Sequence, residues 1–401
     1  MSILGPKIRL VDSESATPQP LLPGNEGWHP PADVRPNPSK KSFLKSSYTS
    51  PMKNRLHPTV LLPAMLLAVS APSFVQADTL VVLNKSEATA SLIDLDSGEV
   101  RATLPTGNGP HEAAVSPDGR HALVGNYGTR EKPGSSLIVI EVPTAKVVKT
   151  IDLGEYRRPH GLLWLPDGRR ALVTAEDNRA LLLIDVEKGV VENSFATEQD
   201  VSHMVEVALG GTRAFVANIG SGSVSVIDLE KGTKIRTITT GAGAEGITAS
   251  VDGREIWVTN RSADTVSVID AESLEILAQI PCASFPIRAK ATPDGKHVLV
   301  SCARTADIAV LDVASRKEVR RIPQDLRAVD TGDRLFGDQF GESSVPIGIV
   351  IHPNGKKAWI AHTNADVVAE IDLETWKIVR LLEAGREPDG MAYSALEVKT
   401  D

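Results

Sequence analysis

A pattern of about 42 residues recurs six times along this chain, and a seventh copy is divided between its two ends. The clearest copy covers residues 249–280. It has a first β-type run, a tight turn at Val251-Asp252-Gly253, a second run that ends in Val258-Thr259-Asn260, a third run at residues 265–270 and a fourth run. Short β-runs separated by Gly and Asp turns, at a period of about 40 to 50 residues, are typical of propeller blades. The repeat therefore predicts a β-propeller.

Two recurring features give the register of the copies. One is an acidic residue after the third run, and it falls at Asp94, Glu141, Asp185, Asp228, Asp270, Asp312 and Asp372. The other is a tight turn between the first and second runs, such as Pro117-Asp118-Gly119. Pro presets φ, Asp caps the turn with its side chain, and Gly tolerates positive φ. Alternating third runs such as residues 224–227 have the period of half-buried strands. Each copy thus predicts four antiparallel strands.

The two ends of the repeat region complement each other. Residues 79–104 supply a second, third and fourth run without a first run, whereas residues 391–396 form a first run alone. Pairing the C-terminal run with the N-terminal three completes a seventh blade and removes an exposed sheet edge. We therefore expect an all-β, seven-bladed propeller over residues 78–401, closed by its C-terminal strand.

The repeat resembles a known family at Val258-Thr259-Asn260 and the third run that follows it. These residues resemble the YVTN-type β-propeller repeat, and residues 79–396 are similar to the YncE-like seven-bladed propellers. Repeats of this type occur in binding proteins, surface proteins and enzymes, so the resemblance implies the fold and leaves the function open.

The first 77 residues lie outside the repeat. Residues 52–77 have the pattern of a secretory signal peptide: a basic start, an apolar core at residues 60–69 and a small-residue cleavage site ending at Ala77. The core is too short for a membrane span, which needs about 20 residues. Residues 1–51 carry nine prolines and no periodicity, which indicates a disordered extension or an upstream start assigned in error. We expect a secreted or periplasmic protein with no membrane span after removal of this segment.

The net charge and the cysteine content of the chain limit the kinds of partner and cofactor that it is expected to have. Residues 1–77 hold 8 of the 43 basic and 4 of the 51 acidic residues, so the rest carries 35 basic and 47 acidic residues, a net charge of −12. This acidic balance argues against nucleic acid as a main partner. The two cysteines, Cys282 and Cys302, either form a disulfide or are small buried residues. The Cys-x-x-Cys-His signature of covalent haem is missing from the sequence.

The candidate site comes from aligning the repeats. The position seven residues before the turn Asp, or its equivalent, lies at the entrance of each first strand, on the face with the variable loops, where function is expected. Nine histidines in 401 residues predict fewer than one histidine among seven such positions, yet three are found. The ring around the channel mouth reads His111, His160, His203, Glu245, Ile287, Ile347 and Asp389, with Glu112 and Arg288 one residue further in.

Three histidines and a carboxylate suit zinc, copper or iron, so His111, His160 and His203 are candidate metal ligands. The alternative is that a histidine was copied with its blade and lines a polar, solvent-filled mouth. A second ring, at the end of the second strands, consists mostly of asparagines that suit turns. Within it, Arg304 together with Arg261 and Arg288 suggests an anion-binding sector.

An insertion of about 18 residues at 323–346 interrupts a fourth-to-first connection, on the same face as the histidines. It contains Phe336 and Phe340, and it predicts either a lid over the channel mouth or a flap that stabilises the domain.

Three functions remain open from the sequence. The first is an exported module that binds a small molecule or a protein at the variable-loop face. The second is a hydrolase of the lactonase type, with Glu112 or His111 as general base and Arg288 holding an anionic group. The third is a structural protein of the cell surface. The sequence has no Gly-x-Ser-x-Gly elbow, P-loop or His-Glu-x-x-His motif, so we favour a binding protein over an enzyme.

Overall fold

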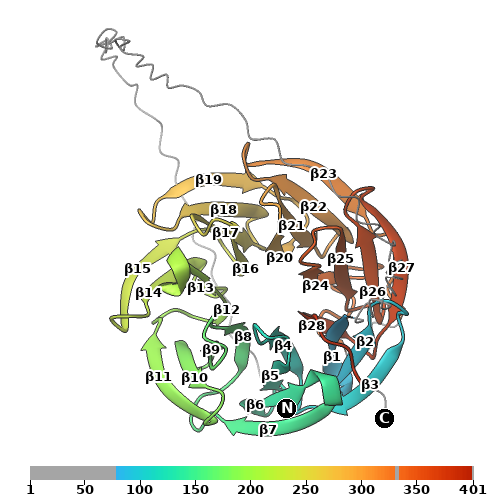
Figure 1. Ribbon diagram of the computed structural model, residues 1–401. Coiled ribbons are helices and arrows are strands. Elements are labelled where there is room, and N and C mark those ends of the chain that lie inside the picture. The colour runs from blue at the N-terminus through green and yellow to red at the C-terminus, as the bar shows by residue number, and fades with distance from the viewer. Residues whose placement is uncertain (1–77, 330–333, 400–401) are drawn as a thin grey trace, which may run out of the picture. The chain divides into compact units, whose positions relative to one another are not determined.

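The computed structural model describes residues 78–329 and 334–399, which form a ring of seven four-stranded antiparallel sheets (Figure 1). The predicted extension at 1–51 and signal segment at 52–77 lie outside the described residues. From the innermost strand outward, the blades are: blade 1, β28 (Pro388–Ser394), β1 (Thr79–Asn84), β2 (Thr89–Asp94) and β3 (Val100–Pro105); blade 2, β4 (Pro110–Val115), β5 (His121–Gly128), β6 (Pro133–Glu141) and β7 (Lys146–Asp152); blade 3, β8 (Pro159–Trp164), β9 (Arg170–Ala175), β10 (Ala180–Asp185) and β11 (Val190–Ala196).

The remaining four blades repeat this plan. They are: blade 4, β12 (Ser202–Ala208), β13 (Arg213–Asn218), β14 (Ser223–Asp228) and β15 (Thr233–Thr239); blade 5, β16 (Ala244–Ala249), β17 (Glu255–Asn260), β18 (Thr265–Asp270) and β19 (Ile276–Pro281); blade 6, β20 (Pro286–Ala291), β21 (His297–Cys302), β22 (Asp307–Asp312) and β23 (Lys317–Pro323); blade 7, β24 (Pro346–Ile351), β25 (Lys357–His362), β26 (Val367–Asp372) and β27 (Lys377–Glu383).

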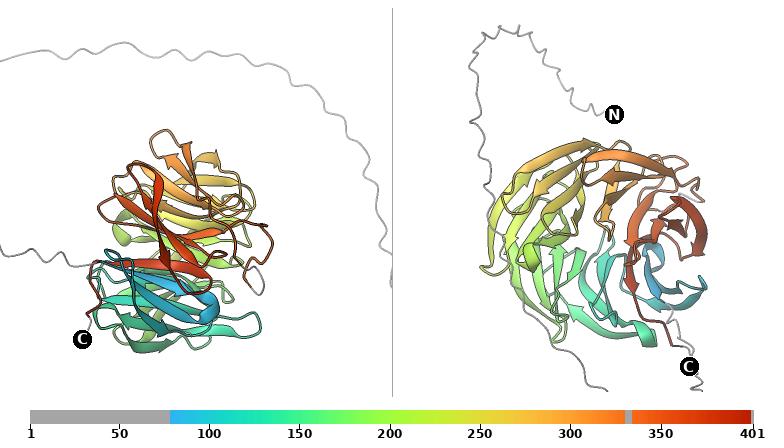
Figure 2. Two further views of the ribbon diagram at one scale, coloured as in Figure 1. Left: turned by 90° about the vertical axis from the view of Figure 1, so that its right-hand side faces the viewer. Right: turned by 45° about the horizontal axis from the view of Figure 1, so that its top comes forward.

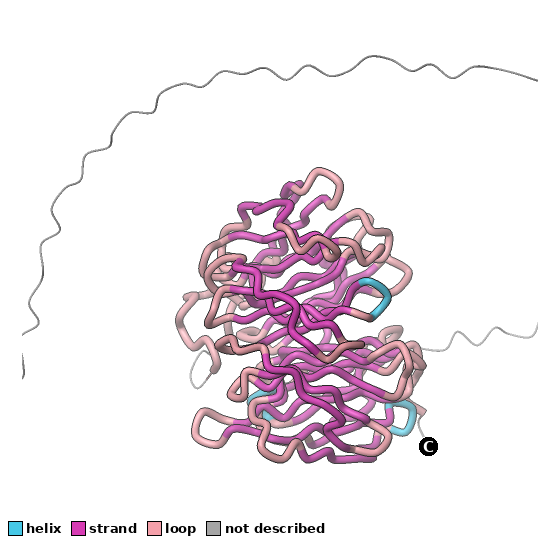
Figure 3. Tube along the Cα trace, turned by 90° about the vertical axis from the view of Figure 1, so that its left-hand side faces the viewer, coloured by secondary structure: helices cyan, strands magenta, loops and turns pink. Residues whose placement is uncertain are grey.

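Helix is almost absent from the described residues, which contain three short 3-10 turns, η1 (Lys85–Glu87), η2 (Val142–Thr144) and η3 (Leu209–Gly211) (Figure 3). Within this part of the chain, none of the helices has the length and hydrophobicity needed to span a membrane. The predicted all-β class is confirmed.

The ring closes as predicted. β28 pairs antiparallel with β1, with Val81 opposite Ala392 and Thr79 opposite Ser394, so that the C-terminal strand lies beside the N-terminal strands (Figure 2). Ser394 also donates a hydrogen bond of 2.6 Å to the carbonyl of Gly119 in the turn of blade 2. The C-terminal strand therefore contacts the next blade as well as completing its own.

The predicted turns are present, but the predicted half-burial of the third strands is wrong. Gly253 has φ +67°, and Asp270 accepts hydrogen bonds from the backbone N–H of Glu272 and Ser273 at 3.1 and 2.7 Å. In β14, however, Ser225 is as buried as its apolar neighbours, since the adjacent blades cover both faces of a blade. Its hydroxyl accepts a hydrogen bond from Asn218 Nδ2 at 3.1 Å. The asparagines of the second ring therefore form hydrogen bonds across the hairpin between the second and third strands.

The inner strands pack very closely around the channel. A Cβ on Gly246 would lie 2.3 Å from the carbonyl oxygen of Ile287 on the next blade. Thr259 connects the same two strands, because its hydroxyl accepts a bond from the Gly246 N–H at 2.8 Å and donates one to the Ile287 carbonyl at 2.9 Å. Thr174 makes the same bridge between Gly161 and His203. These bridges hold the entrance residues of neighbouring inner strands in place.

Candidate functional site

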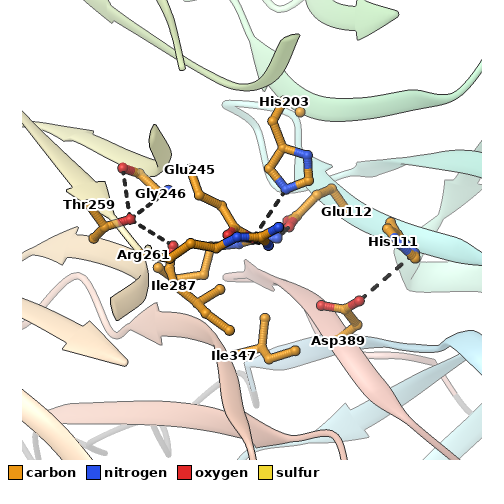
Figure 4. Close-up of polar contacts among 12 residues, drawn as sticks. His111, Glu112, His203, Glu245, Gly246, Thr259, Arg261, Ile287, Ile347 and Asp389 are labelled. Atoms are coloured by element: carbon orange, nitrogen blue, oxygen red, sulfur yellow. Dashed lines mark hydrogen bonds and ion pairs between the residues drawn. The ribbon is translucent and has the colours of Figure 1, made fainter. Parts of the chain in front are cut away.

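The seven aligned positions are all the second residue of an innermost strand, and they line one cavity of about 290 Å³ at the channel mouth. These positions contribute three histidines, two carboxylates and two isoleucines to the lining, in the order of the blades: His111, His160, His203, Glu245, Ile287, Ile347 and Asp389. The polar members are at most 8% exposed. The structure thus brings the sequence-predicted ring together (Figure 4).

The three imidazoles contact one another in series across blades 2, 3 and 4. The ring centroids of His160 and His203 lie 3.5 Å apart, and those of His111 and His160 lie 5.0 Å apart at an interplanar angle of 87°. His111 also stacks on Tyr127, with centroids 4.5 Å apart. The approach of neighbouring inner strands, which Gly161 permits, brings these side chains into contact.

Glu176 completes the cluster, and the sequence analysis did not select it as a site residue. It follows β9 in the second ring, at a position where most blades have Asn, and this substitution was the available signal. His203 Nδ1 donates to Glu176 Oε1 at 2.5 Å, and the Tyr127 hydroxyl donates to Oε2 at 2.6 Å. His160, Glu176 and His203 each offer one atom that could ligate a metal ion, and these three atoms all lie within 4.8 Å of one another. We call these three residues the histidine cluster.

The cluster has the chemistry of a transition-metal site. Two nitrogen ligands of a tetrahedral zinc ion, each about 2.0–2.1 Å from the metal, lie roughly 3.3 Å apart, so a small contraction of the cluster would suffice. His160 Nδ1 is buried and forms no hydrogen bond with a described residue, whereas His203 Nε2 faces the Glu245 carboxylate at 3.4 Å. Buried polar atoms normally have partners. The residues present therefore fit a bound cation.

The environment sets different charge states for the histidines. Burial lowers the pKa of His111 and His160 well below 6.5, so these imidazoles are neutral and available as ligands. For His203, burial also opposes protonation, but the hydrogen bonds and charges of Glu176 and Glu245 outweigh it and raise the pKa. The cluster thus combines the neutral imidazole of His160 with that of His203, from which a bound cation would have to displace a proton.

A buried ionic network lies beside the cluster. Arg288 Nη2 donates to Glu112 Oε1 at 2.6 Å, and Arg288 Nη1 donates to Glu245 Oε1 at 3.0 Å. Glu245 also accepts a bond of 2.7 Å from Arg261 and lies 3.4 Å from His203 Nε2. Burial raises the pKa of Glu245, but the hydrogen bond from His203 and the charges of Arg261 and Arg288 lower it to about 2. This network holds its charges in compensated pairs.

The same ionic network contains Glu112 and Arg288, to which the hydrolase hypothesis gives the roles of general base and anion holder. Glu112 accepts two bonds from the Arg288 guanidinium, at 2.6 and 3.1 Å, and Arg288 is only 8% exposed. A general base needs a free lone pair, and an anion holder needs a free guanidinium edge. Since the two groups neutralise each other, the geometry gives this hypothesis no positive support.

The other predicted residues lie further from the cluster. Arg304 does not line the cavity; it lies 3.7 Å from Asp264 and stacks over Phe285 at 5.9 Å. Arg261 stacks over the same ring at 5.3 Å, and it does reach the cavity. Cys282 and Cys302 are buried free thiols in one apolar cluster.

The insertion at 323–346 reaches the channel mouth. Leu335 and Phe336 line the same cavity as the histidines. Phe340 packs on Phe285 of blade 6 with ring centroids 5.0 Å apart, and Arg334 binds both carboxylate oxygens of Asp366 on blade 7 at 2.7 Å. The described part of the insertion therefore contributes an apolar wall to the site and is anchored to two blades.

The fold and this site define a seven-bladed propeller with a polar cavity at one channel mouth. A family model described as YNCE-like beta-propeller matches residues 171–332, so this part of the chain is similar to the YncE-like β-propellers, in agreement with the seven-bladed ring. No curated protein sequence matches the chain significantly.

Solved structures similar to this chain include three at 16–18% identity, and a likeness at this level shows the fold alone. Hydrazine synthase of Kuenenia stuttgartiensis is 18% identical with a TM-score of 0.59, over 71% of this chain and 89% of that chain. The dihydro-heme d1 dehydrogenase NirN in complex with DHE is 17% identical with a TM-score of 0.55, over 80% and 77%. A functionally unknown protein from Desulfotomaculum acetoxidans DSM 771 is 16% identical with a TM-score of 0.65, over 80% and 100%.

Proposed function

We propose that this protein is a binding propeller that holds a transition-metal ion at the channel mouth, with His160, Glu176 and His203 as ligands. The observation that carries the proposal is the buried histidine cluster, in which three donor groups from two blades lie within 4.8 Å of one another. Imidazole and carboxylate ligands suit zinc, copper or iron. His111 lies next to His160 and offers a fourth donor from blade 2.

Binding fits the site better than catalysis does. The ligands are buried, the neighbouring charges are paired, and the insertion adds Leu335 and Phe336 to the cavity wall. Such a cavity suits retention of a metal ion or a metal-bound small molecule.

Metal titration of the purified protein tests the proposal. After treatment with a chelator, the protein should bind one zinc, copper or iron ion in calorimetry and elemental analysis. His160→Ala and His203→Ala should each abolish or strongly weaken binding, because such sites need three or four protein ligands. His121→Ala, at the start of β5 on the tight-turn face, is the matched control and should bind like the unmodified protein. Absence of stoichiometric metal in the unmodified protein would refute the proposal.

We also propose export with cleavage after Ala77, on the strength of the tripartite pattern at residues 52–77. N-terminal sequencing of the protein recovered from the producing cells should begin at Asp78. A recovered protein that retains residues upstream of Met52 would contradict this proposal.

A further inference from the structure

A second cavity adjoins the histidine cluster on the same face. It has a volume of about 680 Å³, and it shares His111, Tyr127 and Leu335 with the inner cavity. Its other walls come from η1 after β1, the β4 entrance, the β5–β6 loop and the described end of the insertion. The stacked pair of His111 and Tyr127 therefore separates two halves of one larger site.

The outer cavity is basic, although the whole chain has a net charge of −8. Its lining contains one carboxylate, that of Glu387, and four basic side chains, namely Lys85, Arg130, Arg158 and Arg334. Two of these bases have carboxylate partners, because Arg334 binds Asp366 and Arg158 lies 3.3 Å from Asp177. Arg130 is exposed and forms no salt bridge with a described residue. The cavity thus has positive charge in excess of its local partners.

Lys85 is the unusual member. Its Nζ is inaccessible to water and forms no hydrogen bond with any residue in the described ranges. The nearby Glu387 does not provide one, since its two carboxylate oxygens accept bonds from the Leu335 N–H and the Ser86 hydroxyl. A buried ammonium without a hydrogen-bonded counter-charge is costly.

Asp389 also acts electrostatically on Lys85, but within the described ranges no hydrogen bond joins the two side chains. Burial lowers the pKa of Lys85, and a bound anion would oppose this shift.

We propose that the outer cavity binds the carboxylate or phosphate group of a small anionic molecule through Lys85 and Arg130. The molecule lies along the His111–Tyr127 wall, and its other end reaches the histidine cluster. Lys85 lines the cavity, and the proposal requires its flexible four-carbon stem to rotate so that the buried ammonium reaches the anion. Only the contact with the cluster rests on the proposed metal-binding function; the anion site stands on the outer cavity alone.

Calorimetric titration of the metal-free protein with malonate, inorganic phosphate and the uncharged malonamide tests the inference. We expect malonate or phosphate to bind and malonamide to give no heat. Lys85→Met and Arg130→Gln should each weaken binding about tenfold, the effect of losing one charge-assisted hydrogen bond. Lys132→Gln, in the same β5–β6 loop but outside the cavity lining, is the control and should bind like the unmodified protein.

The outcomes separate the two proposals. Binding of phosphate alone identifies a phosphate-bearing ligand, and binding of malonate alone identifies a carboxylate. If Lys85→Met and Arg130→Gln retain zinc binding but lose the anion, the anion site is supported whatever the result for His160→Ala. Equal anion affinity in both variants and the unmodified protein, or no anion binding with or without zinc, would overturn the inference. Arg130 is exposed, so its variant answers the question even if Lys85→Met does not fold.

Discussion

His203 Nδ1 donates a hydrogen bond of 2.5 Å to Glu176, although the two residues are 27 positions apart and belong to neighbouring blades. Glu176 follows the second strand of blade 3, and His203 enters the first strand of blade 4. Tyr127 of blade 2 binds the second oxygen of the same carboxylate. One carboxylate therefore connects three blades at the place where the proposed metal site lies.

This relationship predicts graded effects on metal binding. Glu176→Gln should weaken zinc binding strongly, since it replaces a charged ligand with a neutral amide. Tyr127→Phe leaves the ligands intact and removes one bond that orients the carboxylate. Outer partners of this kind are worth about 10- to 100-fold in metal affinity. Calorimetry at one pH should therefore rank the unmodified protein first, Tyr127→Phe second and Glu176→Gln third. Equal affinities for Tyr127→Phe and the unmodified protein would show that the bond does not position the ligand.

Asp389 should make stability depend on pH. Its pKa is 3.8 in the unfolded chain and about 7 in the fold, where burial raises it. The folded state therefore binds more protons between these values, so the stabilisation is present below pH 3.8 and is lost as the pH rises through 7. Asp389→Asn removes this loss. Urea unfolding should show a larger gain at pH 8 than at pH 5, and the two gains should differ by on the order of 2 kcal/mol.

Asp252→Asn is the control of opposite sign for that experiment. The hydrogen bond from Ser250 and that from the Arg254 N–H lower the pKa of Asp252 in its turn. This variant should therefore lose stability at pH 8 and less at low pH. An identical effect of Asp389→Asn at pH 5 and pH 8 would mean that Asp389 does not titrate in this range.

Removal of one member of the buried ion pair between Arg288 and Glu112 should lower the free energy of unfolding. Arg288→Met leaves Glu112 buried without its compensating charge, and breaking a buried pair in this way costs about 3–5 kcal/mol. Glu112→Gln in the same chain should restore part of that loss, although Glu245 also loses a partner. Chemical denaturation of the two single variants and the double variant measures the coupling. Additive losses would show that the two side chains do not stabilise each other.

Closure of the ring should depend on the last strand. Deletion of residues 391–401 removes most of β28 and leaves β1 as an unpaired edge, which promotes aggregation. We expect insoluble protein or a thermal transition without cooperativity. Deletion of residues 400–401 alone is the control and should leave the transition unchanged. A soluble protein that melts cooperatively after the larger deletion would contradict this closure.

The propeller architecture could be predicted from the sequence, because every blade carries its own strand pattern and turn chemistry. Residue spacing was enough to assign His111, His160 and Asp389 to one structural position, and all seven members of that ring line one cavity. Repetition makes this inference strong, since one register applies to every blade. The turn glycines and the acidic caps after the third strands were predictable for the same reason.

The contacts between polar residues of different blades became evident only in the folded structure. Glu176 belongs to a different sequence ring from His203, and the two join because neighbouring inner strands approach closely where Gly161 has no Cβ. Arg288 forms ion pairs with both Glu112 and Glu245, which belong to two other blades. Residue spacing along the chain does not predict these pairs. Side-chain pairing, burial and the resulting pKa shifts depend on distances between blades, whereas a repeat pattern specifies only positions within a blade.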